Sequence, residues 1–267
     1  MEKPKFDIRY KRKLLYKRKR RRQLIFRLSA ILSGICILSL ILLLNDKTYV
    51  NKKVTFSSNS EDKTIVCIDP GHGDWDIGTK GISGSLEKDI VLDISLKLGN
   101  LLEENGIKVV YTRTNDLLPW LETANDSLKE RIKIPEVFKA DLFISIHCNS
   151  DLDNKDAKGI ETWYKANDEN SKNLAQSLQN ALADLNYTEN RNLKTYESKD
   201  DALAVLELNK SIPALIELGF LSNPSDEKYL KSDRGQEASA KAISEGILQY
   251  IEENKDIILE ERSKKLG

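Results

Sequence analysis

Histidine is nearly absent from this 267-residue chain, which contains only His72 and His147. Cysteine is scarce as well, and Cys36, Cys67 and Cys148 have neither zinc-finger spacing nor the number needed for a disulfide framework. No internal repeat is visible, which excludes a repeat array. Any metal chemistry in this chain must therefore depend on very few side chains.

A phosphate-binding loop is also missing, although one glycine-rich stretch resembles one at first sight. The stretch "IDPGHGDWDIGTKG" follows a short apolar run and carries Gly71, Gly73 and Gly78. A P-loop needs a Lys-Ser/Thr pair after its second glycine, and a dinucleotide loop needs G-x-G-x-x-G; neither spacing is present. Asp74 and Asp76 would repel an anion. The loop is therefore better suited to a cation than to a phosphate.

The formal net charge of zero hides a strong asymmetry. Residues 1–27 contain thirteen Lys or Arg and two acidic residues, a net of about +11, so the remaining residues carry about −11. Residues 28–44 are uncharged and apolar, which is just long enough for a membrane-spanning helix. The positive-inside rule predicts a cytoplasmic tail (1–27), a signal-anchor (28–44) and an external remainder. Secretion after signal cleavage is the alternative, although no A-x-A site follows the span. Nucleic acid is not expected as a partner.

The rest of the chain divides into a polar tether at residues 45–62, a folded domain at 63–254 and a charged C-terminal extension at 255–267. Within the domain, Cys67 and Cys148 both lie in strand-like runs. Buried free thiols are the simple expectation for such positions. A location outside the cytoplasm would also permit a disulfide between them.

The folded domain alternates between strand-like and helix-like patterns. Apolar runs predict strands, helical spacing predicts helices, and their alternation predicts βαβ units with a mostly parallel sheet and helices on both faces. The predicted strands are 64–69, 107–113, 141–147, 159–164 and 213–218. The predicted helices are 85–106, 127–140, 170–186, 201–207 and 235–254.

This topology brings four chemically capable residues to one edge of the sheet. Sites in open α/β sheets form at the carboxyl ends of the strands. His72 follows the first predicted strand, His147 ends the third, and Glu217 lies near the end of the fifth. Glu87 lies in the first turn of the helix that returns from the first strand. We expect all four at the same edge.

Two imidazoles and a carboxylate form a common catalytic zinc set, because they leave a fourth coordination position open. His72, Glu87 and His147 provide this set. Glu217 lies in the apolar run "ALIELGF", where an unpaired carboxylate would be costly, so it must have a partner or face a cleft. A free glutamate beside zinc suits hydrolysis, since it can move a proton to the leaving group.

The motifs "IDPGHG", "EKD", "TR", "ADLFISIHCN" and "PALIELGFLSNPSDEKYL" occur in this order between residues 64 and 252. Because these motifs occur together and in this order, the chain resembles the zinc-dependent N-acetylmuramoyl-L-alanine amidases of amidase family 3, the AmiC/LytC type. The resemblance implies a three-layer α/β/α fold with a twisted, mostly parallel six-stranded sheet. It also implies one Zn²⁺ bound by His72, Glu87 and His147, with Glu217 as the catalytic residue.

The resemblance further implies that the substrate is peptidoglycan, cleaved at the amide between N-acetylmuramic acid and the L-alanine of the stem peptide. Arg113, Arg131 and Asn149 are predicted substrate-binding residues. The alternatives are another zinc peptidase that acts on wall peptides and an inactive wall-binding or regulatory relative. A cysteine amidase based on Cys148 is disfavoured, because Cys148 is adjacent to His147 on a predicted strand and the side chains of adjacent strand residues do not face each other. No protein activator can be predicted.

Overall fold

The computed structural model describes residues 63–118 and 123–266. The predicted cytoplasmic tail (1–27), signal-anchor (28–44) and tether (45–62) lie outside these ranges. Among the helices of the described ranges, none has the length and apolar character needed to cross a membrane.

Six strands form one sheet in the order β2-β1-β3-β6-β4-β5. Every neighbouring pair is parallel except β4 and β6, which run antiparallel. The predicted mixed α/β fold with a mostly parallel six-stranded sheet is therefore confirmed. The strands are β1 (Ile65–Pro70), β2 (Lys108–Tyr111), β3 (Leu142–Asn149), β4 (Ile160–Tyr164), β5 (Asn190–Lys194) and β6 (Ile212–Phe220).

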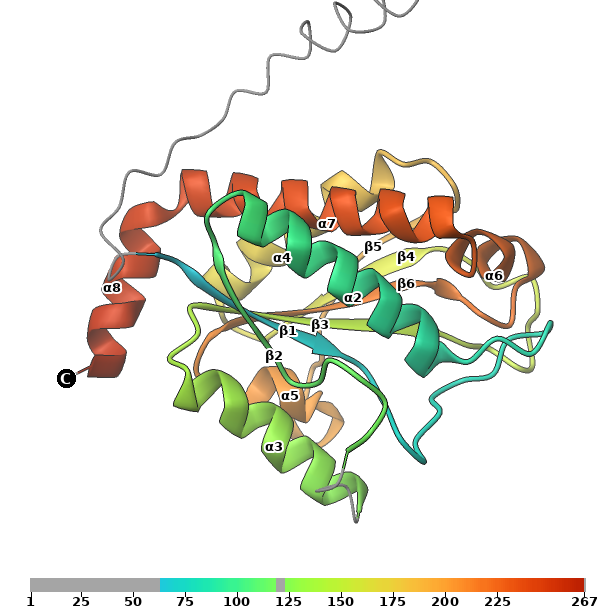
Figure 1. Ribbon diagram of the computed structural model, residues 1–267, viewed down its shortest axis with the longest axis horizontal. Helices are drawn as coiled ribbons and strands as arrows, with labels where there is room; N and C mark the ends of the chain where they lie inside the picture. Colours follow the sequence, from blue (N-terminus) through green and yellow to red (C-terminus); the bar gives the residue numbers. More distant parts are fainter. Residues whose placement is uncertain (1–62, 119–122, 267) are drawn as a thin grey trace, which may run out of the picture. The chain divides into compact units, whose positions relative to one another are not determined.

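Helices cover both faces of the sheet (Figure 1). The long amphipathic helices α2 (Glu87–Glu104), α4 (Glu169–Ala183) and α7 (Asp233–Glu253) lie on one face, and α3 (Ala124–Val137) and α5 (Ala204–Glu207) lie on the other. The larger apolar cluster fills the first side, and two smaller clusters lie under α3 and α5. The second face is thus more thinly covered, which leaves room for a site at its edge.

Three further helical segments complete the fold: the 3₁₀ turn η1 (Lys199–Asp201), α6 (Pro224–Leu230) and α8 (Lys255–Leu266). Helix α8 lies within the predicted C-terminal extension. Its Arg262 donates to Asp141, the residue directly before β3, at 2.7 Å, and to the Lys63 carbonyl at 3.2 Å. These contacts attach the charged helix to the amino ends of β1 and β3.

Two elements had no counterpart among the sequence-predicted elements. Strand β5 reads "NRNLK", a polar edge strand whose Asn192 has a positive φ, so neither alternation nor an apolar run marks it. Helix α6 begins with a recognisable signal, because Asn223 caps it and Pro224 follows. That signal is easily missed in so short a helix.

The two cysteines of the domain are buried and free. Their strands, β1 and β3, are neighbours, as the sequence suggested. Cys67 packs in the small cluster on the α3 face, whereas Cys148 packs in the large cluster on the opposite face. A disulfide is absent because the two side chains lie on opposite sides of the sheet.

Candidate metal and catalytic site

Strand alternation directs His147 and Glu217 to the thinly covered face of the sheet. On β3, Ile146 and Cys148 belong to the large core cluster, so His147 between them points to the other side. On β6, Ile216 and Leu218 also belong to the large core cluster, so Glu217 between them points to the other side as well. His147 and Glu217 are register partners across the β3–β6 pairing. The two side chains therefore lie next to each other at the carboxyl end of the sheet.

His72, Glu87 and His147 form a compact cluster of potential metal ligands. Their donor atoms all lie within 4.8 Å of one another. Glu87 Oε1 lies 3.1 Å from His72 Nε2 and 3.1 Å from His147 Nδ1, and the two imidazole rings meet nearly at right angles. Two imidazole nitrogens converging on one carboxylate oxygen fit the donor set of a catalytic zinc site. The sequence thus predicted three residues that the fold does bring together.

Glu87 is firmly held by backbone donors. It is the first residue of α2 and is almost fully buried. Its Oε2 accepts from the Thr79 amide at 2.8 Å, and its Oε1 accepts from the Cys148 amide at 2.9 Å. Burial alone would raise the pKa of Glu87, but the hydrogen bonds with His147 and His72 hold that pKa well below its usual value. Glu87 is therefore an ionised carboxylate held in a fixed orientation.

Asp76 supports His72 from the outer side. Asp76 Oδ2 lies 2.9 Å from His72 Nδ1, the ring nitrogen that faces away from Glu87. A carboxylate on the second nitrogen of a metal-binding histidine sets its tautomer and orientation. Burial lowers the pKa of His72, but Glu87 and Asp76 together raise it above its usual value. The aspartate that seemed out of place in a glycine-rich loop thus orients the His72 ring.

Two glycines are needed because the ligand side chains lie directly against the loop backbone. A Cβ on Gly71 would lie 2.4 Å from His147 Cε1. A Cβ on Gly78 would lie 2.5 Å from Glu87 Oε2 and 2.6 Å from His72 Cδ2, and Gly78 also has a φ of 64°. The loop glycines therefore make space for the side chains of His72, Glu87 and His147.

Arg113 and Arg131 both bond to the segment that leads into His72. Arg113 is buried; its Nε donates to the Pro70 carbonyl at 3.0 Å, and its Nη2 donates to the Gly71 carbonyl at 2.8 Å. Arg131 Nη1 pairs with the fully buried Asp69 at 2.5 Å, and Arg131 Nη2 donates to the His72 carbonyl. Both guanidinium groups are thus engaged with the protein's own backbone around His72.

Glu217 carries a carboxylate oxygen that no other group satisfies. Its Oε2 is buried and has no hydrogen-bond partner among the described residues. The residue as a whole is partly exposed. Burial, followed by the charges of Glu87 and Glu161, raises the pKa of Glu217 well above its usual value. A strongly shifted pKa of a carboxylate at such a site makes Glu217 a candidate functional residue.

Glu161 is a site residue that the sequence analysis missed. It is buried on β4 as the register partner of Glu217. Its carboxylate accepts from Asn149 Nδ2 at 3.1 Å, from Trp163 Nε1 at 3.2 Å and from Arg191 Nε at 2.8 Å. The sequence does carry a signal for Glu161, because this carboxylate lies in the apolar run "GIETWY", just as Glu217 lies in an apolar run. Arg191 lies in the polar strand β5, where no such signal exists.

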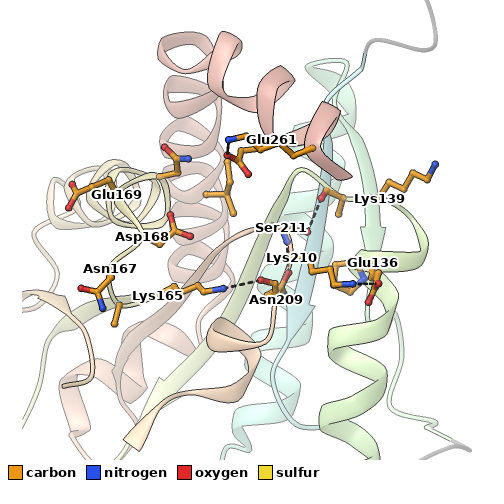
Figure 2. A pocket seen from close by; sticks show the side chains of 16 residues that line it. Glu136, Lys139, Lys165, Asn167, Asp168, Glu169, Asn209, Lys210, Ser211 and Glu261 are labelled. Carbon is orange, nitrogen blue, oxygen red and sulfur yellow. Dashed lines mark hydrogen bonds and ion pairs between the residues drawn. The ribbon is translucent and has the colours of Figure 1, made fainter. Parts of the chain in front are cut away.

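A pocket of about 910 Å³ lies at the opposite end of the strands (Figure 2). It is lined by residues near the starts of β3 and β6 and contains none of the predicted site residues. Its polar groups are largely paired with one another: Lys210 bonds Glu136 at 2.5 Å, and Lys165 donates to the Asn209 carbonyl at 3.3 Å. The carboxyl end, where metal ligands and an unsatisfied carboxylate meet, is the better candidate.

Comparisons with known proteins identify the family of the chain. Residues 66–249 match the family described as N-acetylmuramoyl-L-alanine amidase. The germination-specific N-acetylmuramoyl-L-alanine amidase of Bacillus subtilis is 31% identical over 222 residues, covering 76% of this chain and 90% of that protein. LytC of the same organism, an N-acetylmuramoyl-L-alanine amidase, is 36% identical over 187 residues, covering 69% of this chain. The match spans only 35% of LytC.

Solved structures give the same result. The CwlD amidase from Clostridioides difficile, solved in complex with the GerS lipoprotein, superposes with a TM-score of 0.66 at 34% identity, covering 71% of this chain and 99% of that chain. A second N-acetylmuramoyl-L-alanine amidase from Clostridium difficile 630 superposes with a TM-score of 0.64 at 34% identity, covering 72% and 98%. Fold and site together define a hydrolase domain with a candidate metal centre. The chain belongs to the N-acetylmuramoyl-L-alanine amidase family, so the predicted class of peptidoglycan hydrolase is confirmed.

Proposed function

We propose that this protein hydrolyses peptidoglycan at the amide bond between N-acetylmuramic acid and the L-alanine of the stem peptide. The observation that carries the proposal is the convergence of His72, Glu87 and His147 beside Glu217 at the carboxyl edge of the sheet. Membership of the amidase family supports the choice of bond. The acidic charge of the chain outside its first 27 residues provides no independent evidence for the substrate.

His72 Nε2, Glu87 Oε1 and His147 Nδ1 would hold one Zn²⁺. Imidazole nitrogens and a carboxylate oxygen suit this ion, and three protein ligands leave a position open. Bound zinc supplies Lewis-acid polarisation of a carbonyl and lowers the pKa of water. Asp76, 2.9 Å from His72 Nδ1, would keep the proton of His72 on that nitrogen, which would leave the Nε2 lone pair available to a metal.

Glu217 is the proposed proton carrier. Its unpartnered Oε2 accepts a proton from the attacking water and returns it to the amide nitrogen that leaves as the amino group of L-alanine. The position of Glu217 is set by the β3–β6 hydrogen-bond ladder, which also sets that of His147. Proton carrier and metal ligand are therefore held in a constant relative position by backbone hydrogen bonds.

Arg113 and Arg131 are proposed to act as positioning residues. Both donate to carbonyls of the segment 70–72, which has left-handed backbone geometry at His72, with a φ of 60°. Their bonds hold this strained segment in place. Asn149 stays a proposed substrate contact, and its amide is oriented by Glu161.

The bond specificity is tested by digesting purified peptidoglycan with the zinc-loaded full-length protein and identifying the new chain ends. Free amino groups on L-alanine, together with intact lactyl carboxylates on the muramic acid, are the expected products. New carboxyl termini within the stem peptide would show a peptidase instead. Wall binding without any new ends would show an inactive, wall-binding relative.

We also propose that residues 28–44 anchor the protein in the cell membrane, with residues 1–27 in the cytoplasm and the catalytic domain outside. The support is the uncharged run flanked by thirteen cations on its N-terminal side. Protease added to cells stripped of their wall should degrade the catalytic domain and leave a membrane-bound N-terminal fragment. Protease resistance of the whole chain would contradict this orientation, and release into the medium would indicate signal cleavage.

A further inference from the structure

The wall of the site beyond Glu217 carries an arginine that has a fixed position and unused donors. Arg191 lies on β5, the edge strand next to β4. Its Nε donates to Glu161 Oε2 at 2.8 Å, and Glu161 is the register partner of Glu217. The guanidinium group therefore lies one hydrogen bond beyond the carboxylate that neighbours the proposed proton carrier.

Three contacts fix the Arg191 side chain. Its guanidinium carbon lies 4.9 Å from the centre of the Phe220 ring, a stacking distance. Its aliphatic stem lies against Gly159, where an added Cβ would approach Arg191 Cγ to 2.7 Å. Glu161, only 5% exposed, holds the Nε edge. A side chain held in this way loses little conformational entropy when it binds a further group.

The terminal nitrogens of Arg191 are nonetheless free to bind. Among residues 63–118 and 123–266, the only hydrogen bond that Arg191 makes through its guanidinium is the one from Nε. The side chain is 36% exposed, so the outer edge of the group reaches solvent. A planar guanidinium with one edge occupied and the other open is suited to a bidentate bond with a carboxylate.

We propose that Arg191 binds a carboxylate of the stem peptide and makes the enzyme prefer stems that carry one. This inference rests on the proposed function. In the proposed substrate the lactyl carboxyl of the sugar is consumed in the scissile amide, so the free carboxylates lie on the peptide side. Arg191 therefore marks the peptide side of the site, next to β4 and β5, and the glycan extends away from it.

The competing explanation is that Arg191 only neutralises the buried Glu161. The two roles differ in what they do to substrate preference. Loss of a purely structural partner would change the cleavage of all substrates to the same degree. Loss of a carboxylate receptor would selectively impair the substrate that carries the carboxylate.

The test compares two soluble substrates, N-acetylmuramoyl-L-alanyl-D-glutamate and the same compound with both carboxylates of its D-glutamate converted to amides. For the zinc-loaded full-length enzyme we expect kcat/KM to favour the carboxylate by about 10-fold or more, as for a charge-assisted hydrogen bond. Arg191→Gln should reduce that ratio to near one, mainly through KM. Arg191→Lys keeps the charge without the planar fork and should retain only part of the preference.

Lys158→Gln is the matched control, because Lys158 is a nearby surface cation whose partner is Glu189, at 3.3 Å. It should keep the wild-type preference. An unchanged preference in Arg191→Gln, or an equal loss on both substrates, would overturn the proposal while leaving the amidase function intact. If the wild-type enzyme cleaves neither substrate and also releases no L-alanine amino groups from peptidoglycan, the proposed function itself fails, and this inference with it.

Discussion

His147 and Glu217 are register partners on adjacent parallel strands, with side chains on the same face of the sheet. A ligand of the proposed metal and the proposed proton carrier are thus placed by one backbone ladder. Glu161 continues the row on β4 as the partner of Glu217. Three residues that are far apart in the sequence become neighbours in space, because strands pair in a fixed register.

Glu217→Gln should keep its metal and lose most of its activity. The amide has nearly the same shape as the carboxylate but cannot accept the proton, and general acid–base groups contribute about 10²- to 10⁴-fold. His147→Ala should lose the metal itself. Metal content measured beside amino-group release from peptidoglycan separates the two effects. A fully active Glu217→Gln protein would remove Glu217 from the mechanism.

Asp76→Asn should weaken zinc binding by about 10- to 100-fold, as expected when the support of a histidine ligand is removed. Asp76 Oδ2 lies 2.9 Å from His72 Nδ1. The matched control is Asp74→Asn in the same loop, because Asp74 Oδ2 accepts from the Leu118 amide instead of a ligand. Competition with a chromogenic chelator measures both affinities. Equal losses in the two variants would indicate a general effect of loop charge.

Gly78→Ala should abolish metal binding, whereas Gly84→Ala should not. Both glycines have positive φ, so both substitutions strain the backbone. At Gly78 the new methyl group would collide with Glu87 and His72, whereas at Gly84 the nearest atom is 3.9 Å away. Zinc content and thermal unfolding of the two variants provide the comparison. Retention of metal in Gly78→Ala would show that the ligands can shift to accommodate a methyl group.

Asp69→Asn should destabilise the protein at pH 7 by about 3 kcal/mol or more, because it leaves Arg131, whose side chain is only 11% exposed, without its charge partner. Burial raises the pKa of Asp69. The charge of Arg131 and the hydrogen bond from Thr112 act in the opposite direction and outweigh burial, so the net shift of this pKa is downward. A lowered pKa stabilises the fold above the unfolded value of about 4, and the stabilisation is lost as the pH falls through the folded pKa.

Urea unfolding between pH 7 and pH 2.5 tests this linkage. The difference between wild type and Asp69→Asn should be constant above about pH 5 and should shrink below about pH 4. Glu130→Gln is the control, since Glu130 forms only an exposed pair with Lys133 at 3.1 Å and should change stability by less than about 1 kcal/mol. If the difference in unfolding free energy did not depend on pH, the ion pair with Arg131 would not be what lowers the pKa of Asp69.

Much of the fold could be predicted because its signals are local. The apolar run of β1 and the helical spacing of α2 identify these elements directly, and their alternation implies a parallel sheet. Strand β5 could not be predicted, because its polar residues form a strand only through pairing with β4. The antiparallel direction of β4 against β6 also depends on tertiary pairing, which no local pattern encodes.

The ligand set was predictable for a different reason. The chain has two histidines, both at strand ends, and few residue types can bind zinc. The supporting residues were less accessible. Asp76 and Asp74 are alike in sequence, and only the loop conformation directs one to His72 and the other to the Leu118 amide. Substrate binding by Arg113 and Arg131 stays a prediction, and only the structure shows that both also donate to the backbone around His72.

The sequence by itself determined the class of elements, their order and the four residues that carry the proposed chemistry, because hydrophobic periodicity and residue type are local properties. Only the tertiary structure decided which oxygen of Glu87 meets both histidines, that Glu161 stands beside Glu217, and that Arg191 keeps its outer edge open. These facts depend on strand register and on side-chain packing between distant segments. Both arise only when the whole sheet has formed.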